Sequence, residues 1–257
     1  MFKKLKIELK TNKEIEIMKV AGKVVGEVLE KVKELIKPGI KTKEIDVWIE
    51  GYIRSLNMEP AFLGVEGKFF PFPASACISI NNELVHGIPD SRKLELGDIV
   101  SIDTGVIYNG YYGDAARTYP VGDISKEASK LLEITEKSLA NGIKQAGQEK
   151  RLGDISHAIQ KTIEDNGFSV VRDFCGHGIG RSLHEDPPVF NFGDRDRGVK
   201  LQTGMVLAIE PMANVGGYEV RTLENGWTVV TKDRSLCAHF EDTIAITEHG
   251  VEILTKV

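Results

Sequence analysis

Two aspartates in a stretch that otherwise favours a buried β-hairpin most constrain what this chain can fold into. Asp103 follows the run 98–102, whose mostly apolar, β-branched residues indicate a strand. Asp114 follows the dipeptide Asn109-Gly110, which is a strong hairpin-turn signal. A hairpin would bring the two carboxylates face to face, where they repel each other unless one binds a proton or a cation lies between them. Two exposed hairpin aspartates are the alternative, and this stretch alone does not decide between them.

The composition excludes several classes of function. The 257-residue chain carries a net charge of -5, and its Lys and Arg residues are dispersed, which argues against nucleic acid or an anionic membrane as the main partner. Cys77, Cys175 and Cys237 are widely spaced and form no CxxC pair, which argues against a disulfide framework or a thiolate zinc site. No run approaches the ~20 apolar residues of a membrane span, or forms a signal peptide after the Lys-rich start. We therefore expect a soluble cytoplasmic protein.

The periodicity of apolar residues predicts alternating groups of helices and strands. Helices are predicted from a capping box at Thr11 to Pro38-Gly39, and over 42–56, 125–145 and 154–166. Strands are predicted over 76–80 and 98–103, and near 170–174, 205–209, 227–231 and 238–246. Residues 60–73, which are rich in Gly, Pro and Phe, are predicted to form a loop.

An internal repeat indicates how these elements are organised. Residues 97–103 match residues 204–210 position by position in character, and each copy ends an apolar run on a carboxylate, Asp103 or Glu210. Upstream, isoleucines at 45, 49 and 53 match those at 155, 159 and 163, and the two pairings are offset by 107 and 110 residues. We therefore expect one α+β domain over residues 1–257, built from two related halves, with Asp103 and Glu210 pointing toward a shared cleft.

Three further residues join the aspartates as candidates for chemistry. His177 lies between two glycines, Glu210 ends an apolar strand, and Glu241 lies within one. With Asp103 and Asp114, the carboxylates would bring about four negative charges into one dry cleft, which would raise their pKa values sharply or prevent folding. Two divalent cations would neutralise them, and a pair of metal ions ~3.5–4 Å apart is a known arrangement for hydrolysis.

Six motifs occur in an order and spacing that resemble the methionine aminopeptidases, in their short bacterial type I form. They are NELVHGIP, SIDTG, GYYGDAART, GHGIGRSLHEDP, AIEPM and HFEDT. The resemblance covers nearly the whole chain. It implies the pita-bread metallopeptidase fold, in which two halves related by a pseudo-twofold axis share a central antiparallel sheet flanked by helices.

The resemblance also implies a set of site residues. The ligands of a dinuclear metal site would be Asp103, Asp114, His177, Glu210 and Glu241. The oxygen-rich donor set suits Mn, Fe(II) or Co and is compatible with Zn. Glu210 would also shuttle a proton, His184 would donate to the developing oxyanion, and His86 would contact the scissile nitrogen or the substrate backbone. His239, on the strand face of Glu241, is a candidate partner of the ligands.

A pocket for the methionine side chain is implied at four positions, which are Phe72, Cys77, Leu183 and Trp227. Phe72 stands where the family commonly has Tyr, and Leu183 where Phe is common. The pocket stays apolar and is expected to accept an unbranched thioether. The alternative is that Trp227 and Phe72 are ordinary core residues. For the neighbouring Phe69 and Phe70, a core position and a pocket position are equally compatible with the sequence.

The implied activity is removal of the initiator methionine from nascent polypeptides whose second residue is small, by a cytoplasmic monomer that binds the ribosome transiently. One rival is an aminopeptidase of the same fold that prefers Xaa-Pro peptides, but those proteins usually carry an extra N-terminal domain, and a helix is expected here from Thr11. A second rival is a binding protein that has lost its metals, which would lack ligands, whereas all five are present.

Overall fold

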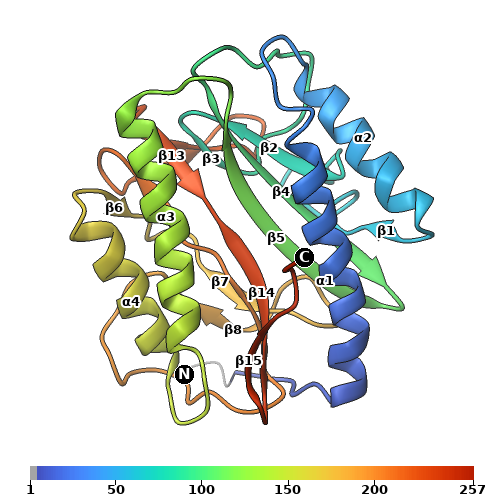
Figure 1. The fold of residues 1–257 in the computed structure, drawn as a ribbon, viewed down its shortest axis with the longest axis vertical. Coiled ribbons are helices and arrows are strands. Elements are labelled where there is room, and N and C mark those ends of the chain that lie inside the picture. Colours follow the sequence, from blue (N-terminus) through green and yellow to red (C-terminus); the bar gives the residue numbers. More distant parts are fainter. Residues whose placement is uncertain (1–4) are drawn as a thin grey trace.

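One antiparallel sheet runs through both halves of the protein in the computed structural model, which describes residues 5–257 (Figure 1). Its strands follow the order β1-β4-β5-β14-β9-β7-β8, with β2 paired to β4 and β15 paired to β14. They are β1 (Glu59–Pro60), β2 (Ala76–Ile80), β4 (Ile99–Tyr108), β5 (Tyr111–Pro120), β7 (Gly176–Gly178), β8 (Glu185–Val189), β9 (Val206–Ile209), β14 (Glu241–Thr247) and β15 (Gly250–Ile253).

Two smaller antiparallel sheets complete the β structure of residues 5–257. One has the order β13 (Cys237–His239), β10 (Met212–Asn214) and β6 (Ser169–Val170), and the other has β11 (Val220–Thr222), β12 (Val229–Thr231) and β3 (Glu83–Val85). The strand predicted over 238–246 is therefore two strands, because β13 pairs with β10 whereas β14 belongs to the main sheet.

The helices begin where the sequence predicts or within two residues of it. They are α1 (Asn12–Val32), α2 (Thr42–Ser55), α3 (Lys126–Gln145) and α4 (Leu152–Glu164). The predicted capping box of α1 is present, since Thr11 and Glu14 exchange hydrogen bonds. α4 begins before Asp154 because that carboxylate accepts from the Arg151 backbone N–H at 2.9 Å, as a residue of the first turn. The prediction that α1 continues to Pro38 is wrong, because turns replace the helix after Val32.

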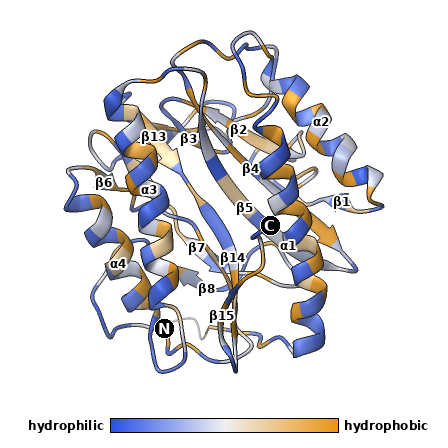
Figure 2. Cartoon of the chain, in the orientation of Figure 1, coloured by the Kyte–Doolittle hydropathy of each residue, from blue (hydrophilic) through white to orange (hydrophobic). Residues whose placement is uncertain are grey.

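Each half has its own hydrophobic core, which supports the internal repeat. One core lies between α1, α2 and the strands β2 and β4, and the other between α3, α4 and the strands β9 and β14. Figure 1 shows α1 and α3 on the same face of the main sheet. Figure 2 shows that β14, at the junction of the halves, begins with a hydrophilic stretch. None of the helices in residues 5–257 is long and apolar enough to cross a membrane.

The predicted hairpin is present, and its strands are longer than the sequence pattern indicated. Asn109 and Gly110 form its turn with φ angles of +49° and +77°, and each strand is 10 residues long. Asp103 therefore lies in the middle of β4. Its cross-strand partner is Ala116, whereas Asp114 faces Gly105. The two aspartates are diagonal neighbours on one face of the sheet. Their carboxylates still meet as predicted, and the charge of Asp114 contributes to the raised pKa of Asp103.

Glycine at position 22 lets α1 approach the sheet. A Cβ atom at Gly22 would lie 2.6 Å from the carbonyl oxygen of Leu254, and a Cβ atom at Gly113 of β5 would lie 2.7 Å from the Gly22 nitrogen. Gly51 of α2 offers a matched comparison, since its Cβ would meet nothing within 4 Å.

We predict opposite effects of the same substitution in the two helices. Gly51→Ala should raise the free energy of unfolding by about 0.5–1 kcal/mol, because alanine has the higher helix propensity. Gly22→Ala should lower it by about 1–3 kcal/mol, because the added methyl group meets backbone that cannot move aside cheaply. Urea unfolding of the metal-free protein measures both, and equal stabilisation by the two substitutions would show that α1 does not depend on this close approach.

Candidate metal centre

The register of the main sheet places three acidic side chains on one face. Ala116 of β5 pairs with Asp103 of β4 on one side and with Glu241 of β14 on the other. Residues directly opposite each other in an antiparallel pair point to the same face, and so do residues two apart along a strand. Asp114, two residues before Ala116, therefore points the same way as Asp103 and Glu241.

The second half of the chain adds a glutamate and a histidine to this face. Glu210 directly follows β9, whose last residue pairs with Asp242 of β14, so Glu210 comes beside Glu241. His177 of β7 pairs with Ala208, two residues before Glu210. The Nε2 atom of His177 lies 3.8 Å from Oε1 of Glu210. All five predicted ligand positions thus converge, as the internal repeat suggested for Asp103 and Glu210.

The glycines on either side of His177 allow its strand to fit between two neighbours. A Cβ atom at Gly176 would lie 2.2 Å from the carbonyl oxygen of Ala208, and one at Gly178 would lie 2.3 Å from that of Asp186. Any larger residue would push β7 away from β9 or β8. The Gly-His-Gly motif therefore holds the imidazole close to the carboxylates.

The carboxylates lack the partners that buried charges require. Among the described residues, Oδ1 of Asp103, Oδ1 of Asp114 and Oε1 of Glu241 are buried with no hydrogen-bond partner. Ligand atoms of Asp114, Glu241 and His177 all lie within 4.8 Å of one another. Orphaned carboxylate oxygens around a small gap fit a divalent cation, which would supply the missing favourable interactions.

The electrostatics of the cluster agree with this fit. Burial, followed by repulsion from the neighbouring carboxylates, raises the pKa of Asp103 and Glu241 well above the usual range. Burial raises the pKa of Asp114 to about 7 and lowers that of His177 to about 4. The imidazole is therefore neutral near pH 7, which is the form that binds a metal ion.

His239, the last residue of β13, faces the same cluster. Its side chain is 2 % exposed, and neither ring nitrogen has a hydrogen-bond partner among the described residues. Nε2 lies 3.6 Å from Glu210 and 4.0 Å from Glu241. Burial lowers its pKa to about 3, so the ring is neutral and can donate to a carboxylate without adding charge.

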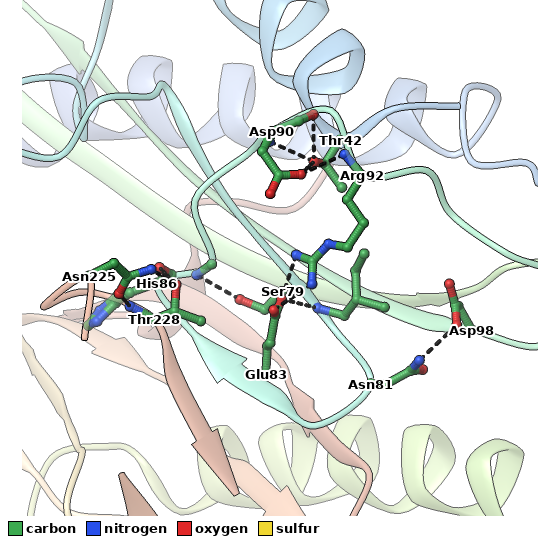
Figure 3. Close-up of polar contacts among 12 residues, drawn as sticks. Thr42, Ser79, Asn81, Glu83, His86, Asp90, Arg92, Asp98, Asn225 and Thr228 are labelled. Atoms are coloured by element: carbon green, nitrogen blue, oxygen red, sulfur yellow. Dashed lines mark hydrogen bonds and ion pairs between the residues drawn. The ribbon is translucent and has the colours of Figure 1, made fainter. Parts of the chain in front are cut away.

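His86 lies across the cavity in an unusual backbone conformation. Its φ angle is +59°, which a non-glycine residue rarely adopts. Figure 3 shows the surrounding polar contacts, in which the Thr228 hydroxyl donates to the His86 carbonyl at 3.4 Å and the Gly87 N–H donates to the Ser79 hydroxyl at 3.0 Å. These contacts hold the backbone on both sides of His86.

An ion pair and a hydrogen bond to α2 hold the segment that carries His86 (Figure 3). Both terminal nitrogens of Arg92 donate to Glu83, at 2.6 and 2.9 Å, and Glu83 also accepts from the Ile80 N–H at 2.9 Å. Asp90 donates its N–H to the Thr42 hydroxyl at the start of α2, at 2.8 Å. The segment around His86 is thus closed on itself by the ion pair and tied to α2 by the bond to Thr42.

An apolar cavity of about 430 Å³ opens above the carboxylates. Its lining includes all the residues predicted for the methionine pocket and both histidines predicted to be catalytic, which are Phe72, Cys77, Leu183, Trp227, His86 and His184. Phe72 and Trp227 meet edge to face with ring centroids 5.1 Å apart. The His184 ring lies 4.5 Å from that of His177.

Sequence reasoning missed other apolar residues of the lining, which include Phe62, Val65, Phe174 and Met212. Phe174 is only three residues before His177, so the Gly-His-Gly motif was a signal that could have identified it. The alternative that Phe69 and Phe70 pack in the core is wrong, because these side chains are 63 % and 39 % exposed. They lie in a loop held by the Trp227 indole, which donates to the Phe70 carbonyl at 3.1 Å.

Comparison with known proteins decides the family. The model of metallopeptidase family M24 matches residues 16–248. The chain belongs to this family and, within it, to the methionine aminopeptidases. It is 56% identical to the methionine aminopeptidase of Clostridium perfringens, over 98% of this chain and 99% of that protein. It is 53% identical to methionine aminopeptidase 1 of Bacillus subtilis, over 96% of this chain and 98% of that protein. Membership in M24 implies divalent metal binding, which the orphaned carboxylates fit.

Solved structures bear out the pita-bread fold predicted from the methionine aminopeptidase motifs. The crystal structure of methionine aminopeptidase from Thermotoga maritima matches with a TM-score of 0.94 and 47% identity, over 98% of this chain and 100% of that chain. The prolidase of Pyrococcus furiosus matches with a TM-score of 0.78 and 24% identity, over 97% of this chain but 65% of that chain. The prolidase likeness concerns the fold alone.

We predict that a divalent cation stabilises this methionine aminopeptidase family member strongly. The cation relieves repulsion that exists only in the folded state. At a concentration about 100 times its dissociation constant, Mn²⁺ or Co²⁺ should therefore raise the free energy of unfolding by about 2.7 kcal/mol and the melting temperature by several degrees. Differential scanning calorimetry of chelator-treated protein measures the shift, with KCl at matched ionic strength as control. An unchanged melting temperature would contradict a metal site at the cluster.

Proposed function

We propose that this protein removes the initiator methionine from polypeptides whose second residue is small. The observation that carries the proposal is a cluster of orphaned, buried carboxylates at the floor of an apolar cavity. We assign the ligands of two divalent cations to Asp103, Asp114, His177, Glu210 and Glu241. Four carboxylates and one neutral imidazole favour Mn, Fe(II) or Co, and Zn is compatible with the same donors.

The chemistry divides between the cations and the residues around them. When bound, two divalent cations lower the pKa of a water molecule to near neutrality and polarise the scissile carbonyl. Glu210 takes a proton from the attacking water and passes it to the leaving amine. Its buried position supports this role, because burial and the charge of Asp114 raise the pKa of its carboxyl well above the usual range.

The two histidines would act on either side of the scissile bond. His184 stands beside His177 at the cavity wall, and partial burial lowers its pKa, so it acts as a neutral donor to the developing oxyanion. His86 contacts the scissile nitrogen or the substrate backbone. Its strained backbone and its contact with the Trp227 ring, at 6.1 Å between centroids, support a fixed position for the imidazole.

The apolar wall would select the methionine side chain. Phe72, Cys77, Leu183 and Trp227 present aromatic, thiol and aliphatic surface, and an unbranched thioether makes favourable contacts with such groups. Burial raises the pKa of Cys77 well above its usual range, so the thiol stays neutral and contributes as a small apolar group. Beyond the scissile bond, a closed cavity edge excludes bulky second residues by clash.

We place the protein in the cytoplasm, where nascent chains present their amino termini. The substrate is then the free terminus of an emerging polypeptide, and a monomer with transient ribosome contact would suffice to reach it.

Peptide cleavage tests the proposed activity. Met-Ala-Ser, Met-Pro-Ser and Met-Leu-Ser peptides are incubated with chelator-treated protein to which Mn²⁺, Co²⁺, Fe²⁺ or Zn²⁺ is added back, and free methionine is measured. We expect release from Met-Ala-Ser that needs metal, and poor release from Met-Leu-Ser. No release from any peptide with any metal would favour a binding protein that retains the fold.

Two substitutions test the assigned ligands. Asp103→Asn and Glu210→Gln should abolish turnover while leaving the fold intact, because each keeps the size of the side chain and removes a charge that the cations require. Circular dichroism checks the fold. Asp165→Asn serves as the control, since Asp165 is exposed in a surface ion pair with Lys161. Near-normal methionine release by either ligand variant would refute the assignment.

A further inference from the structure

We propose that the N-terminal strap, defined as residues 6–14, positions His184 through the ion pair between Lys10 and Glu185. The inference rests on the proposed role of His184 as the oxyanion donor. Glu185 lines the edge of the cavity, but neither Glu185 nor Lys10 is among the residues assigned above to metal binding or catalysis. They act through the backbone that carries His184 and are therefore positioning residues.

The ion pair is buried, although its partners are 175 residues apart. Nζ of Lys10 contacts Oε2 of Glu185, and the two side chains are 6% and 11% exposed. The same ammonium group donates to the Glu8 carbonyl at 3.0 Å. Two of the donors of Lys10 are thus used within the protein, which keeps its side chain in one orientation.

Glu185 passes this constraint to the backbone next to His184. Its second carboxylate oxygen accepts from the N–H of Arg181 at 2.8 Å and from the N–H of Ser182 at 3.1 Å. The carboxylate therefore closes the turn that leads into Leu183 and His184. Because His184 lies between this turn and Glu185 itself, the position of its Cα atom depends on where Lys10 holds Glu185.

The chain leaves room for Lys10 at two glycines. A Cβ atom at Gly180 would lie 2.2 Å from Cε of Lys10, and one at Gly204 would lie 2.8 Å from the Lys10 carbonyl oxygen. The Lys10 N–H also donates to the Gly204 carbonyl at 2.7 Å. Gly204 is only two residues before β9, so the strap is anchored to the strand that leads to Glu210.

The first residues of the strap contact the chain on the other side of His184, at Asp186. Ile7 forms a parallel bridge with Asp186, and the Lys6 N–H donates to the Asp186 carboxylate at 2.9 Å. These contacts lie after His184 in the loop, whereas the amides bound by Glu185 lie before it. The strap therefore fixes both sides of the histidine.

Glu14, at the start of α1, adds a third attachment. Its carboxylate lies 3.4 Å from Nη2 of Arg181, whose guanidinium stacks over the Tyr111 ring at 4.4 Å. Arg181 is largely exposed, so this attachment is weaker than the buried pair. Lys10 is consequently the residue whose loss should release the loop.

A buried ion pair is a poor source of stability, which makes a positioning role the better explanation. Removing two charges from water offsets most of their mutual attraction, and apolar residues of similar volume often replace such pairs without loss. The pair instead fixes the geometry around His184. This matters because displacement of a catalytic group by about 1 Å lowers turnover by about 100-fold.

The test uses the full-length, metal-loaded protein and a Lys10→Met variant, which keeps the length of the side chain and removes its charge. Steady-state cleavage of Met-Ala-Ser should show kcat lower by about 10–100-fold with KM nearly unchanged, because the loop acts on the transition state. Lys19→Met is the matched control, since Lys19 forms a comparable pair with Glu252 on the exposed surface and should leave both constants unchanged.

A second measurement does not depend on activity. Hydrogen–deuterium exchange of the metal-free proteins should show about tenfold faster exchange in Lys10→Met at the Arg181 and Ser182 amides, with protection of α3 and α4 retained. If Lys10→Met does not fold, the double variant Lys10→Met/Glu185→Gln replaces it, because it leaves no unpaired buried charge and keeps an acceptor for the amides. The same loss of kcat is then expected.

The outcomes separate the two proposals. Unchanged kcat together with unchanged exchange in residues 181–186 would overturn the positioning role. A loss of kcat accompanied by faster exchange throughout the protein would overturn it too, since that result describes general destabilisation. If the wild-type protein releases no methionine, the proposed function fails, whereas local release of the loop in the exchange experiment would still support the strap.

Discussion

Repulsion among carboxylates at the junction of the two halves is the constraint on which the rest of this structure depends. Asp103 and Asp114 come from the first half of the chain, whereas Glu210 and Glu241 come from the second. Glu210 is mostly buried and the other three are buried, and burial is the largest cause of the raised pKa of each. Such a cluster is unfavourable unless cations bind it. The fold therefore has to supply enough stability elsewhere to hold these groups in place, and the two apolar cores on the helical side supply it.

The histidines that complete the site are held in place by a different kind of interaction. His86 and His184 come from irregular backbone, where local hydrogen bonding of a helix or strand cannot fix them. Each is instead fixed by an acidic residue that accepts from nearby backbone and is itself paired with a base. Glu83 pairs with Arg92, nine residues away, and Glu185 pairs with Lys10, 175 residues away. The carboxylates gain precision from sheet register, and the histidines gain it from ion pairs beside them.

How much the sequence could predict follows from the range of the interactions involved. Helix starts depend on local contacts, and the Thr11–Glu14 capping box was correctly identified. The shared cleft of Asp103 and Glu210 could be inferred because an internal repeat carried long-range information, whereas the full ligand set was implied by the resemblance to the methionine aminopeptidases. Strands such as β7 (Gly176–Gly178) and β8 (Glu185–Val189) escaped prediction, because they are short, contain glycine or proline, and exist only through their partners. The diagonal placement of Asp103 and Asp114 likewise depends on hairpin length, which the strand pattern underestimated.

The junction between the halves explains why metal binding and folding should be linked in this protein. The pairing of β5 with β14 covers two residue pairs, Glu241 with Ala116 and Asp242 with Ala115. Arg117 reinforces it, donating to the Ala116 carbonyl at 2.8 Å and to the Asp242 carboxylate at 2.7 Å, and the carboxylate also accepts from the Thr255 hydroxyl at 2.7 Å. So short a ladder resists separation weakly by itself. Cations bound between Asp103, Asp114 and Glu241 would join β4, β5 and β14 directly across it, so the ions that perform the chemistry would also hold together the two halves that bind them.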